Sequence, residues 1–106
     1  MRLGLLVFVI LMVYSSAGFA SSRSERAHGA SVFAASGCSH CHSIRNTGGH
    51  KGPDLSGVGR RLKKDQMRRQ ITGGSRLMPP FGDTLQETEI VDLISYLRSC
   101  RDKQKK

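Results

Sequence analysis

Apolar residues recur at helical spacing in three segments of the chain. Intervals of three and four residues between apolar side chains are typical of a helix that buries one face. This pattern predicts helices over residues 24–36, 63–72 and about 87–100. No stretch alternates apolar and polar residues for long enough to predict a strand. The pattern therefore predicts an all-α fold.

The first predicted helix has suitable residues at both ends and on one face. Ser24 can cap its start with a hydroxyl oxygen, and Gly37 can end it by adopting a left-handed backbone. Gly29, Val32 and Phe33 lie together on the face that we expect to point inward.

The second and third predicted helices also have an apolar face that we expect to point inward. The second is expected to bury Leu62, Met67 and Ile71 and to end at the Gly73-Gly74 pair. Glutamates near the start of the third helix and arginines near its end suit the helix dipole. Its expected inward residues are Ile90, Leu93, Ile94 and Leu97.

The first 20 residues differ from the rest of the chain. Arg2 precedes an uninterrupted apolar run over residues 3–14, which is shorter than a membrane span and is followed by small residues. This order predicts a secretory signal peptide over 1–20 and export to the periplasm, with an uncleaved membrane anchor as the alternative. Residues 21–106 then form one domain, which ends in a flexible basic tail from about residue 102.

The predicted domain has few residues with which to build a core. Val, Ile, Leu and Phe make up about 17% of residues 21–106, and the whole chain carries a net charge of +9. Such a composition is typical of disordered chains, although the helical patterns here argue for order. A short chain of this kind often needs a disulfide, a metal or another staple, so we expect a bound group to complete the core.

The cysteines indicate what that group is. Three are present, which argues against a simple disulfide framework; the third, Cys100, is expected to be an unpaired thiol. The run Cys38-x-x-Cys41-His42 is typical of c-type haem attachment. Thiols three residues apart can reach the two vinyl groups of one porphyrin, and His42 can then offer an imidazole nitrogen to the iron.

Two other uses of these cysteines fit the sequence less well. A thioredoxin-like dithiol should follow a strand and open a helix, whereas here the preceding residues are predicted to be helical. A zinc site could use Cys38, Cys41, His50 and Cys100, but their spacing does not form two compact pairs. One covalently bound haem c per chain is therefore the preferred interpretation.

Residues 29–97 resemble a small class I bacterial cytochrome c. The motifs occur in the order that the family has, which is more specific than any one of them. The resemblance implies three to four helices around one haem, with the N- and C-terminal helices crossing closely at Gly29. The chain has no Trp, which many members place against a haem propionate. The motifs are Gly29-x-x-x-Phe33, Cys38-x-x-Cys41-His42, Gly52-Pro53-Asp54-Leu55-x-Gly57, Met78-Pro79-Pro80-Phe81 and Leu93-x-x-Tyr96-Leu97.

The resemblance also implies roles for individual residues. His42 and Met78 would be the proximal and distal iron ligands. The Pro53 carbonyl would accept a hydrogen bond from the second His42 nitrogen. A haem propionate would meet Arg61, with Arg60 as the alternative.

The sequence contains other candidates for the distal ligand besides Met78. A methionine is often core filler, and Met67 and His50 are the other candidates. Met78 is preferred because it lies 36 residues beyond His42 in a loop stiffened by the following Pro79-Pro80 pair.

Iron held from both sides has no open position for a substrate, so the sequence predicts an electron carrier and not an enzyme. The preferred function is that of a monomeric periplasmic protein that shuttles single electrons between larger redox proteins. The alternatives are an electron-entry subunit of a dehydrogenase or oxidase complex, which can be membrane-bound, and a haem enzyme or gas sensor with an open iron site.

The charge is concentrated in one short segment. Six cations and one anion lie between residues 60 and 69. Clustered charge of this kind can steer docking to acidic surfaces of redox partners, and a merely solvated helix face is an equal alternative. Export argues against nucleic acid as the partner. The cations are Arg60, Arg61, Lys63, Lys64, Arg68 and Arg69.

Overall fold

The computed structural model describes residues 22–103, and the predicted signal peptide lies outside them. The described chain is mostly helical, which confirms the predicted all-α fold. None of its helices has the length and apolar character needed to cross a bilayer. The helical elements are a helix over residues 22–35, η1 (Cys38–His40), α2 (Val58–Arg61), α3 (Lys64–Gly73) and α4 (Glu87–Ser99).

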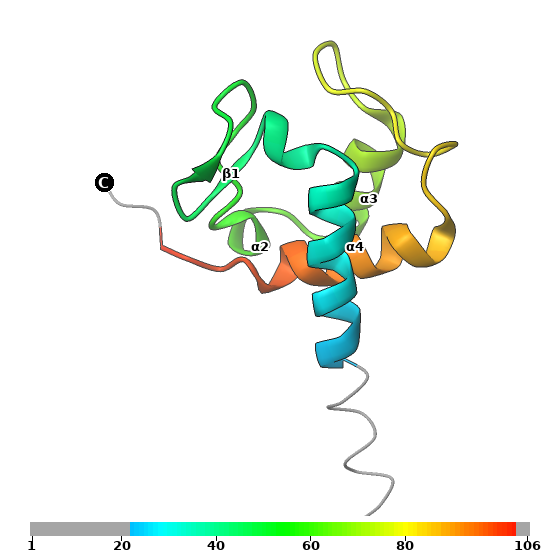
Figure 1. The fold of residues 1–106 in the computed structure, drawn as a ribbon, viewed down its shortest axis with the longest axis horizontal. Coiled ribbons are helices and arrows are strands. Elements are labelled where there is room, and N and C mark those ends of the chain that lie inside the picture. The colour runs from blue at the N-terminus through cyan, green and yellow to red at the C-terminus, as the bar shows by residue number, and fades with distance from the viewer. Residues whose placement is uncertain (1–21, 104–106) are drawn as a thin grey trace, which may run out of the picture.

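The N-terminal helix crosses α4 at a steep angle, as expected (Figure 1). A Cβ atom at Gly29 would overlap the carbonyl of Asp92 and the Cβ of Tyr96, so only glycine permits this approach. Close to the crossing, the rings of Phe33 and Tyr96 meet edge to face with centroids 5.8 Å apart. His28 Nδ1 lies 2.5 Å from an Asp92 carboxylate oxygen and ties the same two helices together at the surface.

The start of the first helix differs from the prediction. Ser24 was expected to cap it, but residues 22–24 are already helical, so the cap prediction was wrong. Serine costs little inside a helix, and its neighbours do not force a start at this position. The predicted end is confirmed, because Gly37 takes a left-handed backbone with φ of 79°.

Two short elements were absent from the prediction. Helix α2 has only four residues, and a two-stranded antiparallel sheet pairs β1 (Ser43–Ile44) with β2 (Thr47–Gly48). The connecting residues Arg45 and Asn46 both have positive φ, as a two-residue hairpin turn of the right twist requires. The sequence pattern did not predict these strands, because two-residue strands are too short to show alternation.

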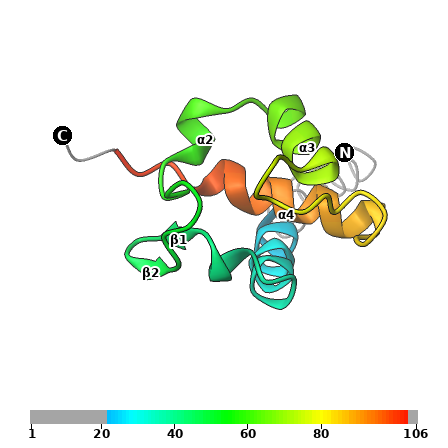
Figure 2. The ribbon, with the colours of Figure 1, turned by 90° about the horizontal axis from the view of Figure 1, so that it is seen from above.

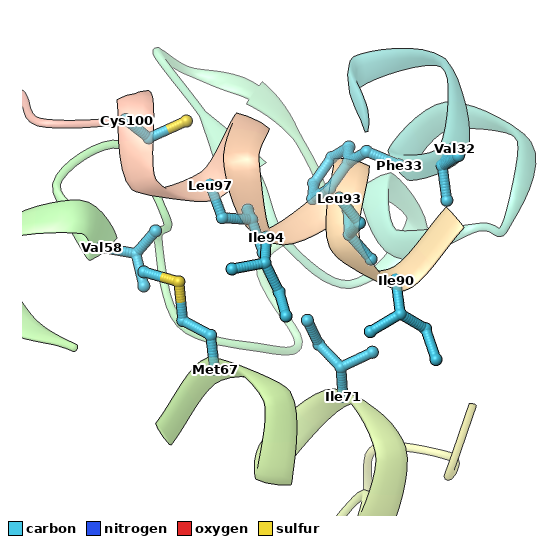
Figure 3. Packing of buried hydrophobic residues seen from close by; sticks show 10 residues of the cluster. All are labelled: Val32, Phe33, Val58, Met67, Ile71, Ile90, Leu93, Ile94, Leu97 and Cys100. Carbon is cyan, nitrogen blue, oxygen red and sulfur yellow. The ribbon is translucent and has the colours of Figure 1, made fainter. Parts of the chain in front are cut away.

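The core lies where α4 meets its neighbours. Seen from above, α4 runs between the N-terminal helix and the pair α2 and α3 (Figure 2). Figure 3 shows the Met67 side chain pointing toward Val58 on one side of α4. Leu62 was expected to point inward, but it ends α2 in an extended conformation and is 36% exposed. The buried apolar cluster is Val32, Phe33, Val58, Met67, Ile71, Ile90, Leu93, Ile94, Leu97 and Cys100.

The segment after α4 is bonded to the middle of the chain. The amide of Gly59 donates to the Cys100 carbonyl at 2.8 Å, and the amide of Asp102 donates to the Ser56 carbonyl at 3.0 Å. The Asp102 carboxylate also accepts two hydrogen bonds from the Arg45 guanidinium. These contacts fasten the end of the domain beside the hairpin, and residues 104–106 of the predicted tail lie outside the described residues.

Candidate cofactor site

The cysteine motif folds into one tight turn directly after the first helix. The left-handed Gly37 redirects the chain into η1, and the amides of Cys41 and His42 both donate to the Cys38 carbonyl, at 3.2 and 2.9 Å. Cys38 and Cys41 are free thiols of intermediate exposure. The turn therefore places two thiols and an imidazole on a single compact segment.

The His42 ring is oriented by the segment that contains Pro53. Its Nδ1 lies 2.8 Å from the Pro53 carbonyl oxygen, and because a carbonyl can only accept, Nδ1 must carry the proton. The lone pair of a neutral imidazole then lies on Nε2, where it can bind a metal. A Cβ atom at Gly52 would lie 2.7 Å from His42 Cε1, so this glycine leaves room for the ring.

Met78 lies in a loop that returns to the helix it has just left. The Phe81 amide donates to the Ile71 carbonyl at 2.9 Å, and the Ser75 amide donates to the Met78 carbonyl at 2.9 Å. In a further contact, which no sequence pattern indicates, Gln70 Nε2 lies 3.5 Å from Met78 Sδ. Backbone and side chain thus both fix this methionine.

His42 and Met78 line the same apolar pocket, together with one thiol of the motif. Met67 is 2% exposed in the core and does not line it, and His50 is exposed. An imidazole nitrogen, a thioether sulfur, two thiols and apolar walls are a donor set and an environment that fit haem c. The lining residues are Phe33, Cys38, His42, Leu55, Ile71, Met78, Phe81, Leu93 and Leu97.

The two arginines expected near a haem propionate have different partners. Arg61 Nη2 donates to the Asp54 carbonyl at 2.8 Å, whereas Arg60 Nε donates to the Arg101 carbonyl at 2.5 Å. Arg61 also borders a polar cavity of about 590 Å³ that Arg45 and Asp102 line as well, and this cavity shares no lining residue with the apolar pocket. Hydrogen bonds from the Ser56 side chain and amide lower the pKa of Asp54 and keep it ionised beside this cavity.

The four candidate zinc ligands do not form one site among the described residues. Burial raises the pKa of Cys38, so the thiol form is favoured at neutral pH. Cys100 is buried at the far end of α4, where burial also raises its pKa and its Sγ lies 3.5 Å from the Tyr96 carbonyl. Within residues 22–103, no three His, Cys, Asp or Glu side chains converge, so the four candidate zinc ligands are not gathered.

Comparison with known proteins gives one match. A family model described as "Cytochrome C oxidase, cbb3-type, subunit III" matches residues 24–97. That span contains the cysteine motif, Pro53 and Met78, and it ends within α4. No curated protein and no solved structure matches the chain.

Proposed function

The chain belongs to the family of cytochrome C oxidase, cbb3-type, subunit III, and from this premise we propose that it is an exported one-electron carrier with a haem ligated by His42 and Met78. The family is one of c-type cytochrome domains, which carry covalently bound haem c. Such domains transfer electrons and are generally not catalytic themselves.

We assign the covalent attachment to Cys38 and Cys41. Their position on one turn, ahead of His42, suits two thioether bonds to neighbouring pyrroles. Both thiols are unpaired, and Cys38 lines the apolar pocket. Attachment at two points would keep the cofactor in place through repeated oxidation and reduction.

The observation that carries the proposal is that His42 and Met78 line one apolar pocket although they lie far apart in the sequence. The Pro53 carbonyl accepts a hydrogen bond from Nδ1 and so orients the imidazole, which leaves Nε2 for the iron, and the loop after α3 holds the thioether. With both residues bound to iron, no coordination position remains for a substrate.

When bound, haem supplies an iron atom that takes up and releases one electron. The side chains around it control water and charge. Phe33, Leu93 and Leu97 exclude water from the pocket, and a dry apolar environment disfavours the more highly charged oxidised state. Arg61 is the residue we assign to a haem propionate, because its exposed guanidinium donates to the carbonyl of Asp54, and the next residue, Leu55, lines the apolar pocket.

We further propose that the signal peptide delivers a monomer to the periplasm, where it docks transiently on acidic surfaces of redox proteins. Three of the clustered cations are partly engaged: Arg60 and Arg61 by backbone carbonyls, and Arg68 by Glu87 at 2.8 Å. The others lie on the exposed surface at the start and outer face of α3, where they can steer a partner. They are Lys63, Lys64 and Arg69.

Absorption spectra of the purified protein test the ligand assignment. The reduced protein should show a sharp α band, and the oxidised protein a weak far-red band that reports sulfur ligation. Met78→Ala should abolish the far-red band, whereas Met67→Leu, the matched core control, should keep it. A high-spin spectrum of the unmodified protein would refute the proposal and favour a haem enzyme or gas sensor with an open site.

A second candidate function is that of an electron-entry subunit within a respiratory complex. The description of the family, which names an oxidase subunit, favours it. The protein should be isolated under mild conditions from cells that produce it at native abundance, and the molecular mass of the isolated species should be measured. Recovery as a monomer supports the free carrier, and recovery with a large membrane-bound oxidase or dehydrogenase supports the subunit.

A further inference from the structure

Helix α3 presents different residues to the core and to the methionine loop. Met67 and Ile71 are buried against the rest of the domain. Gln70 lies on a more exposed face of the helix, and its amide Nε2 lies 3.5 Å from Met78 Sδ, within hydrogen-bond distance for a sulfur acceptor. The only other glutamine of α3, Gln66, turns back to accept a hydrogen bond from the Lys63 amide at 2.7 Å.

The placement of Gln70 follows from backbone contacts between the helix and the loop. The amides of Phe81 and Gly82 donate to the carbonyls of Ile71 and Thr72, at 2.9 and 3.2 Å, directly after Gln70 in the sequence. Gly74 permits the tight return, because a Cβ there would lie 2.5 Å from the Met78 carbonyl oxygen. The donor and the sulfur are therefore held by the same short piece of chain.

A thioether sulfur has two lone pairs. If one binds iron, the other remains able to accept a weak hydrogen bond. Groups that hydrogen-bond to a metal ligand orient it and tune the metal, which is a general property of metal sites. An amide N–H directed at sulfur withdraws electron density from it and brings a positive dipole end near the iron. Both effects disfavour the oxidised state relative to the reduced state.

We propose that Gln70 is a positioning residue for Met78 and that its amide raises the reduction potential of the bound haem. This inference rests on the proposed function, because it requires Met78 to be an iron ligand. It assigns to Gln70 a role that its position on a polar helix surface does not require.

The test compares Gln70→Leu with Gln66→Leu in the haem-loaded protein. Both variants make the same chemical change in the same helix, but only the first removes the donor to Met78. Gln70→Leu should lower the reduction potential and shift the far-red band, because a sulfur without its hydrogen bond donates more electron density to the iron. Gln66→Leu should leave the potential and the band at the wild-type values.

The outcomes separate the inference from the proposal beneath it. A wild-type spectrum without a far-red band overturns both, since Met78 would not be a ligand. If the wild type shows the far-red band and Gln70→Leu has the same band and the same potential as the wild type, only the role of Gln70 is overturned. If Gln70→Leu does not fold, Gln70→Glu keeps the shape of the side chain without the amide donor. It should also shift the far-red band, and an unshifted band overturns the inference.

Discussion

Replacing Gly29 with alanine should destabilise the domain although it adds only one methyl group. The new Cβ would overlap the Asp92 carbonyl and the Tyr96 Cβ, so the N-terminal helix and α4 must separate. The Asp92 carbonyl belongs to the backbone of α4, so it cannot rotate away as a flexible side chain can. The variant therefore tests whether the crossing of these helices holds the fold together.

The expected size follows from three terms. Overpacking of a tight contact costs about 1–3 kcal/mol, and a backbone obstacle places this case near the upper value. Separation of the helices also weakens the Phe33–Tyr96 ring contact, a type of pair that contributes about 0.5–1.5 kcal/mol. Alanine inside a helix gains roughly 0.5–1 kcal/mol over glycine. The net loss should be about 2–3 kcal/mol, a large share of the roughly 5–10 kcal/mol expected for a small domain.

The assay is urea denaturation of the haem-loaded protein followed by far-UV circular dichroism. With a slope of about 1–3 kcal/mol per molar urea, the midpoint should fall by roughly 1 M or more. Gly73→Ala is the matched control, because a Cβ there meets nothing within 4 Å and the residue ends α3. The control should be neutral or slightly stabilised. Equal midpoints for Gly29→Ala and the wild type would refute the tight crossing.

Three further predictions concern charge, cofactor and thiol. Hydrogen bonds from Arg45 lower the pKa of Asp102, so their contribution to stability is present above the ordinary value near 3.8 and is lost as the pH falls through the lowered value. As the pH is lowered from 7 to 2, the Tm of Asp102→Asn should therefore fall less steeply than that of the wild type, and identical curves would contradict this. The Cys38→Ala/Cys41→Ala protein made without haem should be largely disordered by circular dichroism, since its core is too small to offset chain entropy, and a cooperative helical apo protein would contradict this. Cys100, at 5% exposure and with a raised pKa, should react with a thiol reagent quickly only after denaturation, and rapid labelling of the native protein would show the burial to be wrong.

The sequence predicts the parts of the fold that rest on periodicity or on a single obligatory residue. Helices α3 and α4 were anticipated to within one or two residues, because their apolar positions repeat over several turns. The close crossing was anticipated from Gly29 through the family resemblance. The helices depend on information that is local in the sequence, whereas the crossing joins Gly29 to Asp92 and was predicted only through the resemblance.

Other features depend on contacts that the sequence does not display. Helix α2 and the hairpin are too short to show a period. The segment after α4 bonds to both, because the Cys100 carbonyl accepts from Gly59 and the Asp102 carboxylate accepts from Arg45. Leu62 follows the apolar period but lies beyond the end of α2, where the backbone is extended. The contact of Gln70 with Met78 exists only because the loop returns to its own helix, so no sequence pattern marks it.

The central claim is that this chain holds one haem through the thiols of Cys38 and Cys41. Mass spectrometry of the exported protein, intact and after proteolysis, tests it most directly. The mature chain should begin after residue 20 and carry the added mass of one haem, which the peptide containing Cys38 to His42 should retain after denaturation. A mature chain with no added mass, or a haem that dissociates on denaturation, would contradict it.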